Sequence, residues 1–288
     1  MDKRDINIVI VPNTEGSLHD CVLFMFDFYS RQGLRCFISK DVKPGMRNII
    51  NGALLYKSSP DYSSPPGIYP TPDFPSDTII MNMEHLYDDS QWLKHPFAYK
   101  ELLKKYQVYD FNVTNVNYLR NLGNNNVKLI KMGYTRMLKT IPPFLSRDKD
   151  INVLFYGGIN ERRRRFLELI QKEIPGVHIY NNGLWGIDRC NVIARAKIVI
   201  NIHHYTLCNF ESTRAFHLFM NRKFLISEAS NDDNEYKDLA DGFVRTMINS
   251  PRDMVDEIKY YLREEGKREK IAEMGYQLIK KLESSYPL

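Results

Sequence analysis

AKIVINIHHYTLCNFESTRAFHLFMNRKFLISEAS, residues 196–230, contains the pattern from which the fold follows. Its first part, Ile198–Ile202, is a β-branched apolar run of the kind that forms a buried parallel strand. Polar residues follow directly, beginning with His203. A helix with apolar periodicity is expected after Glu211, and residues 223–228 predict the next strand. The polar residues therefore lie beyond the carboxyl end of the first strand, the edge where open α/β sheets bind ligands.

The rest of the chain alternates strands and helices in two series. The predicted strands are residues 6–11, 34–39, 78–83, 107–111 and 127–131 in the first series, and 151–156, 177–180, 198–202 and 223–228 in the second. The main predicted helices are residues 18–32, 96–106, 115–122, 161–174, 188–195, 252–264 and 267–284. Residues 137–150 contain Pro142-Pro143 and no periodicity, which indicates a linker. We therefore predict an α/β protein with two Rossmann-like domains, residues 1–140 and 141–288, the second ending in a helix.

One long segment breaks the alternation. Residues 44–75 are rich in proline, serine and glycine, so irregular extended structure is expected there. A loop of this length inside a domain is unusual unless it has a task such as covering a site. A decorative excursion explains the segment equally well.

The composition is that of an ordinary globular protein, with 43% hydrophobic and 26% charged residues. The sequence has no apolar run long enough for a membrane span and no signal-peptide pattern at the N-terminus. The 4 cysteines are widely spaced without a CxxC pair, so we expect a reduced, cytoplasmic protein with no zinc site. The net charge of +5 is spread along the chain, which argues against a nucleic-acid partner. The oligomeric state is left open.

Several motifs resemble one known family. They are VLFYGGINERRRRFLELI (153–170), IARAKIVINIHHY (193–205), FESTRAFHLFMNRKFLISE (210–228), MNMEHL (81–86) and VYDFNVTNVNYLRNLG (108–123). These motifs are similar to those of small bacterial and viral group 1 glycosyltransferases of the GT-B fold, over about residues 78–280. The resemblance implies two Rossmann-like domains facing across a cleft. It also implies transfer of a sugar from a nucleoside diphosphate sugar, UDP- or GDP-linked and bound mainly by the C-terminal half, to a glycan acceptor held mainly by the N-terminal half.

The diphosphate of such a donor needs cations or backbone N–H groups at a helix start. Gly157 and Gly158 lie where a strand turns into a helix, and glycine there permits a close approach of the backbone to a ligand. Four arginines follow Glu161, but successive helical residues point about 100° apart, so only one or two can face the ligand. We favour Arg162 or Arg163. A solvated basic face is the alternative.

Glu211 and Arg214 are neighbours on one helical face, and we expect Glu211 to bind the ribose diol and Arg214 the diphosphate. A capping acid with a local salt bridge is the alternative. Relatives commonly carry a second glutamate where this chain has His217, which makes Glu211 the better ribose candidate. His203 could line the site or be a packed core histidine. Further binding candidates are Leu184, Trp185, Tyr205, Asn209, Ser212 and Thr213.

An inverting transferase needs a general base for the acceptor hydroxyl. Glu84, Asp110 and His19 are the candidates, in that order, and Arg214 would stabilise the leaving diphosphate. A retaining enzyme would need no such base, and both courses stay open. No metal site and no bound cofactor are expected. A nucleotide-sugar epimerase and a non-catalytic nucleotide-binding scaffold are the alternative functions.

Overall fold

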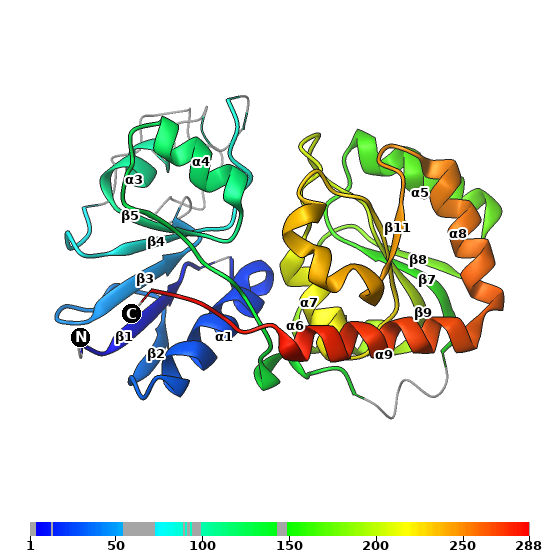
Figure 1. The fold of residues 1–288 in the computed structure, drawn as a ribbon, viewed down its shortest axis with the longest axis horizontal. Coiled ribbons are helices and arrows are strands. Elements are labelled where there is room, and N and C mark those ends of the chain that lie inside the picture. Colours follow the sequence, from blue (N-terminus) through cyan, green and yellow to red (C-terminus); the bar gives the residue numbers. More distant parts are fainter. Residues whose placement is uncertain are drawn as a thin grey trace. The chain divides into compact units, whose positions relative to one another are not determined.

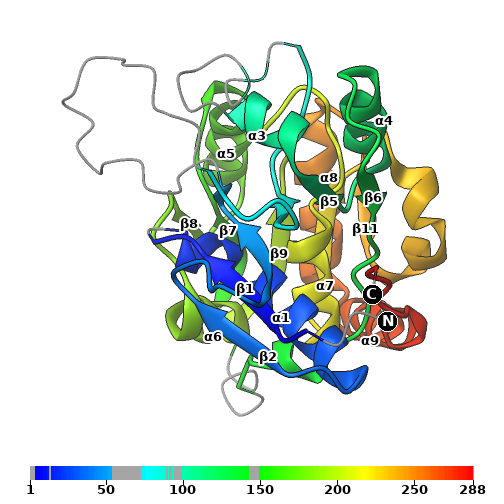
Figure 2. The same ribbon diagram turned by 90° about the vertical axis from the view of Figure 1, so that its left-hand side faces the viewer.

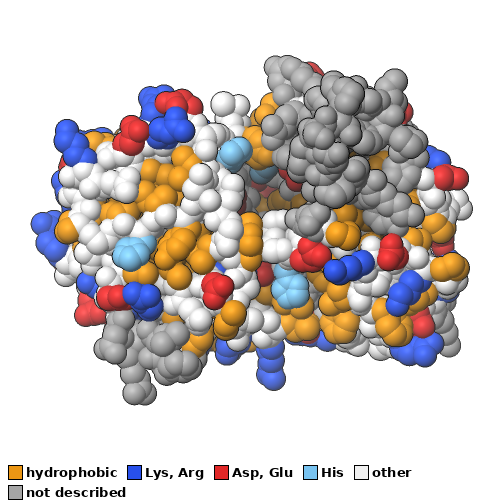
Figure 3. Space-filling view, turned by 180° about the vertical axis from the view of Figure 1, so that it is seen from behind, with side chains coloured by type: hydrophobic (Ala, Val, Ile, Leu, Met, Phe, Trp, Pro, Cys, Tyr) orange, Lys and Arg blue, Asp and Glu red, His pale blue; other side chains and the backbone are white. Residues whose placement is uncertain are grey.

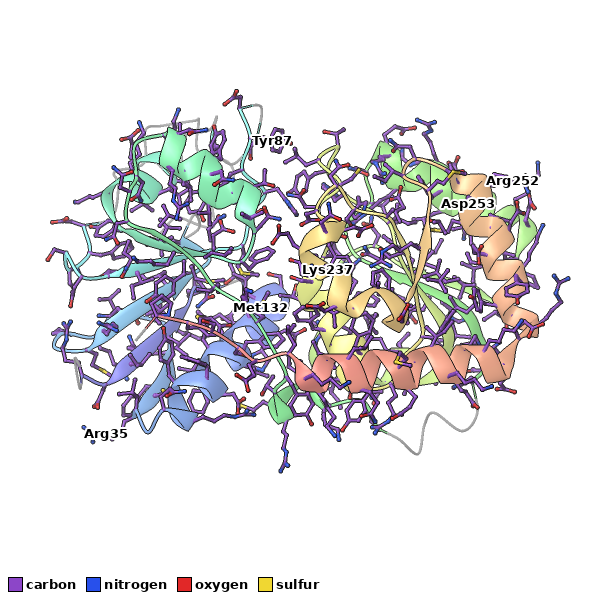
Figure 4. The ribbon with its side chains drawn as sticks, viewed as in Figure 1. Arg35, Tyr87, Met132, Lys237, Arg252 and Asp253 are labelled. Atoms are coloured by element: carbon purple, nitrogen blue, oxygen red, sulfur yellow. The ribbon has the colours of Figure 1, made fainter. Side chains whose placement is uncertain are left out.

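The computed structural model describes residues 4–12, 14–53, 73–88, 90, 93, 99–142 and 149–287. The chain forms two compact units, which Figure 1 colours along the sequence. Unit 1 consists of residues 1–132 together with 283–288, and unit 2 of residues 133–282. Met132, labelled in Figure 4, is the last residue of unit 1 before the chain enters unit 2. The observed division differs from the predicted one at residue 140, because the segment after β6 already belongs to unit 2 and the last residues return to unit 1.

Unit 1 is built on a parallel sheet with the strand order β2-β1-β3-β4-β5-β6. Its strands are β1 (Ile6–Ile10), β2 (Cys36–Ser39), β3 (Arg47–Asn51), β4 (Ile79–Asn82), β5 (Gln107–Asp110) and β6 (Val127–Leu129). Its helices are α1 (Glu15–Arg31), α3 (Tyr99–Lys105) and α4 (Val113–Asn121). Figure 2 shows α1 beside β1 and β2, with which it packs. Apolar residues of α3 and α4 form a core with β1, β3, β4 and β5.

Unit 2 contains a second parallel sheet, with the order β11-β10-β9-β7-β8. Its strands are β7 (Ile151–Tyr156), β8 (Val177–Tyr180), β9 (Ala196–Asn201), β10 (Leu225–Glu228) and β11 (Val244–Thr246). Its helices are η2 (Arg136–Leu138), α5 (Glu161–Glu173), α6 (Gly186–Arg195), α7 (Ser212–Met220), η4 (Asp233–Gly242), α8 (Pro251–Arg263) and α9 (Glu265–Lys281). Helices α5 and α8 pack against each other, as do α7 and α9 (Figure 1). Strands β7, β9 and β10 supply β-branched and aromatic residues to the core with α5 and α8.

The two parallel sheets with covering helices confirm the predicted pair of Rossmann-like units. Most predicted elements appear within a few residues of their expected bounds. The prediction of irregular structure throughout residues 44–75 was wrong at β3, which pairs with both β1 and β4. Residues 54–72 of that segment, and residues 143–148 of the predicted linker, lie outside the described part of the chain.

The last residues of the chain complete unit 1. Tyr286 is buried, with its ring centroid 5.0 Å from that of Phe28 and 5.9 Å from that of Tyr29. The Pro287 carbonyl oxygen accepts hydrogen bonds from the hydroxyls of Tyr29 (3.1 Å) and Tyr109 (3.3 Å). The C-terminal segment is therefore part of the core of a unit whose other residues precede Gly133.

Candidate active site

The strand order of unit 2 places two loops side by side. Strand β7 pairs with β8 on one side and with β9 on the other. The connection that leaves β7 and the one that leaves β9 therefore lead toward opposite edges of the sheet. In doubly wound sheets, ligands bind at this switch point, outside the carboxyl ends of the strands. The loops that leave β7 and β9 contain Gly157-Gly158 and His203, respectively. The predicted binding residues of these two loops are thus neighbours in space.

Gly157 allows two guanidinium groups to approach the backbone. Its φ of +138° lies in a region that residues with a side chain rarely adopt. A Cβ atom here would come within 3.0 Å of Arg214 Nη2 and 3.4 Å of Arg163 Nη1. A residue with a side chain would therefore displace both arginines as well as strain the turn.

Arg163 is held at this point by the first turn of α5. The Asn160 side chain caps the helix by accepting a hydrogen bond from Arg163 N (3.0 Å). The guanidinium of Arg163 donates to the carbonyls of Ile202 (2.8 Å) and Gly158 (2.7 Å), and its side chain is only 5% exposed. Burial and the nearby charge of Arg214 lower the pKa of Arg163 to about 10, so it stays charged at neutral pH.

Arg162 is engaged elsewhere, which argues against its predicted role on the diphosphate. Its guanidinium forms two hydrogen bonds with the buried Glu228 carboxylate (2.6 and 2.7 Å). The same carboxylate accepts from the backbone N–H groups of His203 (2.8 Å) and Asn249 (2.9 Å). The Arg162–Glu228 pair therefore fixes the loops after β9 and β11. Of the next two arginines, both exposed, Arg164 pairs with Glu161 (2.8 Å).

Glu211 lies in a network at the start of α7. Its Oε2 atom accepts hydrogen bonds from Asn201 Nδ2 (2.6 Å) and His203 Nδ1 (2.9 Å). Its Oε1 atom lies 3.8 Å from Arg163 Nη2, and the side chain is 19% exposed. Burial would raise the pKa of Glu211, but the charges of His203, Arg214 and Arg163 hold it well below its usual range. The carboxylate is thus ionised and keeps one oxygen toward the arginine.

His203 has both ring nitrogens beside acceptors. Nδ1 faces the ionised Glu211 carboxylate, and Nε2 lies 3.0 Å from the Ala229 carbonyl oxygen. Neither of these partners can donate, and the Ser230 hydroxyl lies farther from Nε2, at 3.4 Å. The arrangement therefore favours the imidazolium, in which both nitrogens donate. Burial would lower the pKa of His203, but the charge of Glu211 and the hydrogen bond to it raise the pKa above its usual value. His203 therefore orients Glu211 rather than exposing its own ring to a ligand.

Arg214 and Glu211 meet through Asn201, not through a direct ion pair. Asn201 Oδ1 accepts from Arg214 Nη1 (2.8 Å), while its amide nitrogen donates to Glu211 and to Ser227 Oγ (3.0 Å). The Arg214 guanidinium lies 4.8 Å from the centre of the Tyr156 ring, where a cation–π contact is favourable. Arg214 is therefore held in place by neutral groups and retains its positive charge for a ligand.

The remaining predicted binding residues differ in how far they are exposed to solvent. Leu184 is buried, whereas Trp185 is 38% exposed at the start of α6. Ser212 is buried, and its hydroxyl has no hydrogen-bond partner within the described part of the protein. Asn209 is buried too, while Tyr205 and Thr213 are half-buried. Trp185 is accordingly the better placed of the two residues expected to contact the base.

The three general-base candidates belong to unit 1 and differ in accessibility. Asp110 is buried, and its carboxylate accepts from Asn82 Nδ2 (2.7 Å), Asn112 N (2.8 Å) and Asn115 Nδ2 (3.2 Å). This arrangement ties β4, β5 and α4 together and leaves no path to a substrate. Glu84 is half-buried just after β4, and burial raises its pKa to about 7. His19 is exposed on α1.

His217 points to the segment that enters unit 2, not to the Glu211 network. Its Nε2 atom lies 3.1 Å from Thr140 Oγ1, which also contacts Cys190 Sγ at 3.2 Å. One turn later, Asn221 accepts from Ile141 N (3.0 Å) and donates to the Leu138 carbonyl (2.6 Å). Helix α7 therefore carries Arg214 near its start and holds residues 138–141 near its end.

Sequence analysis missed Asn201 and Glu228, which organise the site. Each is the last residue of a buried strand, β9 and β10 respectively. The position of a polar residue at the carboxyl end of a strand was the signal that identified His203, and it applies equally to these two. Among the described residues, no three His, Cys, Asp or Glu side chains gather in a way that could hold a metal ion. No helix in the described ranges is long and apolar enough to cross a membrane.

Comparisons with known proteins agree with this arrangement. A family model described as "Glycosyl transferase-like" matches residues 145–285. No curated protein matches the chain by sequence. Among solved structures, HepE of Anabaena in complex with UDP-glucose is 9% identical, with a TM-score of 0.63 over 96% of this chain and 95% of HepE. WaaG, a glycosyltransferase involved in lipopolysaccharide biosynthesis, is 10% identical, with a TM-score of 0.61 over 94% of this chain and 94% of WaaG. AviGT4, a glycosyltransferase involved in avilamycin A biosynthesis, is 11% identical, with a TM-score of 0.55 over 96% of this chain and 95% of AviGT4.

At these identities the structural similarity defines the fold, which is the GT-B fold of glycosyltransferases. The family match is confined to residues 145–285, which include almost all of unit 2. Residues 145–285 are thus similar to a glycosyltransferase family, and the fold is the one that the sequence motifs implied.

Proposed function

We propose that unit 2 binds the diphosphate of a UDP- or GDP-linked sugar between Arg163 and Arg214. The observation that supports this most directly is the convergence of the two guanidiniums on Gly157, at 3.4 and 3.0 Å from a Cβ built there. Neither arginine forms a close bidentate pair with a carboxylate, in contrast to Arg162. Two like charges held this close repel each other, so a bound diphosphate would relieve that repulsion.

Glu211 is proposed to accept hydrogen bonds from the ribose diol of the donor. Its Oε2 atom is occupied by Asn201 and His203, which leaves Oε1 for a hydroxyl. The imidazolium of His203 keeps the carboxylate ionised, and an ionised carboxylate is the stronger acceptor. The exposed Trp185 ring is proposed to contact the base.

In the reaction, negative charge develops on the leaving diphosphate. Preorganised cations stabilise such charge without having to reorganise during the step. Arg163 and Arg214 would supply this stabilisation, so we expect transfer without a metal ion. Unit 1 is proposed to hold a glycan acceptor, and the free cysteines suit a cytoplasmic protein. The HepE structure with UDP-glucose supports a UDP-linked donor by analogy of fold.

Titration of UDP and GDP into the protein tests the proposal. Arg163→Ala and Arg214→Ala should each weaken binding of the preferred nucleotide by roughly 10- to 100-fold, the loss expected for a hydrogen bond to a charged group. Arg164→Ala is the matched control, since Arg164 lies on the same helix, is exposed and pairs only locally with Glu161. Equal affinities of Arg163→Ala and Arg164→Ala for the nucleotide would refute the assignment.

A further inference from the structure

His204, in the loop after β9, lies against the arginines of the proposed donor site. Its Nδ1 atom is 3.5 Å from Arg163 Nη1, the guanidinium nitrogen that also approaches Gly157. The ring is half-buried and close enough to the Gly158 backbone to form a hydrogen bond with it. His204 therefore adjoins the point on which the Arg163 and Arg214 guanidiniums converge.

The backbone of His204 is fixed, while its side chain is held less tightly. The His204 carbonyl oxygen accepts a hydrogen bond of 2.7 Å from Asn160 Nδ2. The preceding residue, His203, is buried between a carboxylate and a carbonyl group. By contrast, the contact of 3.5 Å between the His204 ring and Arg163 is at the long limit for a hydrogen bond, and Tyr205 packs edge-on with its ring centroid 4.8 Å away. The loop therefore sets the position of the ring, whereas the contact with Arg163 is too long to hold it firmly.

His204 is uncharged at neutral pH in the absence of an anion, because its surroundings oppose a positive charge. Burial, and then the positive charge of Arg163, lower the pKa of His204 below its usual value of 6.5. The Gly158 backbone and the Glu211 carboxylate act in the opposite direction but do not outweigh these two effects. The side chain is therefore a neutral imidazole next to a cationic site.

The titratable side chains that face His204 from the neighbouring elements are Arg163 of α5, Glu211 at the start of α7 and Tyr205 of its own loop. Arg163 is already charged, since its pKa is about 10. Glu211 is ionised, with a pKa well below its usual range, and the phenol of Tyr205 cannot become a cation. His203, the adjacent histidine, already favours the imidazolium. Among these described groups, His204 is thus the one that can gain a positive charge near neutral pH.

We propose that His204 is a proton-linked contact of the donor diphosphate, an imidazole that is neutral in the free protein and becomes an imidazolium in the complex. A diphosphate bound between Arg163 and Arg214 would bring two negative charges to the ring. These charges offset the repulsion from Arg163, so the ring takes a proton from solvent and can donate to a phosphate oxygen. The inference rests on the function proposed above and adds a cation that forms only with the ligand in place.

Calorimetry in two buffers of different ionisation enthalpy measures how many protons the protein takes up when a nucleotide sugar binds. UDP-glucose and GDP-mannose are suitable probes, because both of their phosphates are esterified and neither gains nor loses a proton between pH 6 and pH 8. For the probe that binds more tightly, we expect uptake of up to about one proton per site. The affinity should fall as the pH rises through this range, since binding that takes up a proton is favoured at low pH.

His204→Gln should remove most of the proton uptake while keeping a neutral hydrogen-bonding side chain. Its affinity should be roughly three- to tenfold weaker than that of the parent at pH 6, and the difference should shrink toward pH 8. His178→Gln is the matched control, because His178 is a half-buried histidine on β8 of the same unit, beside Asp150. It should keep both the affinity and the proton uptake of the parent.

The proposed diphosphate site and the role of His204 fail in different ways. If neither nucleotide sugar binds, or if Arg214→Ala leaves the affinity unchanged, the site itself is wrong, and the role of His204 is wrong with it. If binding depends on Arg214 but takes up no proton, or if His204→Gln takes up as many protons as the parent, only the role of His204 is overturned. A loss of affinity in His204→Gln that is equal at every pH would also overturn it, because a purely structural role has this result.

Discussion

At the scale of single residues, three consecutive arginines at the start of α5 have different environments. Arg162 forms a buried pair with Glu228, Arg163 lies among backbone carbonyls beside Gly157, and Arg164 is exposed. In a buried pair such as Arg162–Glu228 the positive and negative charges offset each other. The pair can position loops, but it adds little attraction for an anion. Arg163 donates to neutral backbone carbonyls, and the Glu211 carboxylate lies farther away, at 3.8 Å. The difference arises from Glu228, which is 66 positions away from Arg162 in the sequence.

The imidazolium of His203 predicts a pH dependence of stability. A histidine whose pKa is raised in the folded state stabilises fully below its unfolded value of 6.5, and this contribution is lost as the pH rises through the folded pKa. Glu211, with a lowered pKa, stays ionised throughout that range. We expect the difference in unfolding free energy between wild type and His203→Gln to shrink as the pH rises from 6.5 through the folded pKa of His203. Urea unfolding at each pH measures it, and a constant difference would contradict the assigned protonation state.

Glu84 predicts a pH dependence of activity if the enzyme inverts the anomeric centre. A general base with a pKa raised to about 7 gains activity as the pH rises through that value. Glu84→Gln should lose this limb of the kcat/KM profile and reduce the rate by roughly 100- to 10,000-fold. Glu101→Gln is the control, because Glu101 is an exposed carboxylate of α3 in the same unit. A profile of Glu84→Gln that keeps the same limb would show that another group is the base, or that none is needed.

At the scale of helices and strands, the cap of α5 connects stability with donor binding. Asn160 accepts from Arg163 N (3.0 Å) and donates to the His204 carbonyl (2.7 Å). Asn160→Ala should therefore lower the unfolding free energy by about 1–2 kcal/mol and also weaken UDP or GDP binding, because Arg163 loses its backbone anchor.

Ser250 offers a matched control for this prediction. It caps α8 by accepting from Asp253 N (3.3 Å), and Asp253 is labelled in Figure 4 at the first turn of that helix. Ser250→Ala should cost about 1 kcal/mol of stability and leave nucleotide affinity unchanged. Denaturant unfolding and calorimetry distinguish the two variants. A similar loss of affinity in both would mean that general destabilisation, and not the position of Arg163, is responsible.

The elements that sequence patterns predicted well are those with long apolar periodicity. Strand β7 and helices α5 and α8 belong to this group. Strand β3 was missed because its Ile49-Ile50 pair lies among glycines and prolines, and its pairing with β1 and β4 is a tertiary effect. Strand β11 has only three residues, too few to show a period.

The candidate site was predictable in its location but not in its internal connections. Position at strand ends identified His203, and the start of α7 identified Glu211 and Arg214. The bridging role of Asn201 and the removal of Arg162 from the site depend on side-chain contacts across the sheet. A sequence read along one element does not contain this information.

At the scale of the whole molecule, positive and negative side chains are intermixed on the face shown in Figure 3. On the face shown in Figure 3, the visible Lys and Arg side chains of unit 2 lie near its rim among Asp and Glu. A continuous basic stripe, which nucleic-acid binding would favour, is not seen among the described residues of that face. The absence of a nucleic-acid partner stays a prediction, which a binding titration at physiological salt would test.

Because residues 283–288 belong to unit 1, a substitution near the C-terminus should destabilise unit 1 and not unit 2. Tyr286 is buried against Phe28 and Tyr29, and Tyr286→Ala should destabilise unit 1 by about 3 kcal/mol. Tyr260→Ala is the control, since Tyr260 is a partly exposed tyrosine of α8 and should cost about 0.5 kcal/mol. Hydrogen exchange followed by mass spectrometry locates the effect. Faster exchange in α9 rather than in α1 and β1 would contradict it.

The return of the chain to unit 1 has a consequence for biosynthesis. A ribosome makes residues 1–132 first, yet the segment that fills the space beside Phe28 and Tyr29 is made only after every residue of unit 2. All residues of unit 2 are therefore available for its core before residues 283–288, which complete the core of unit 1, have been made. Domains usually fold in the order in which they are made, and here unit 1 can complete its core only after the last residues of unit 2 have been synthesised.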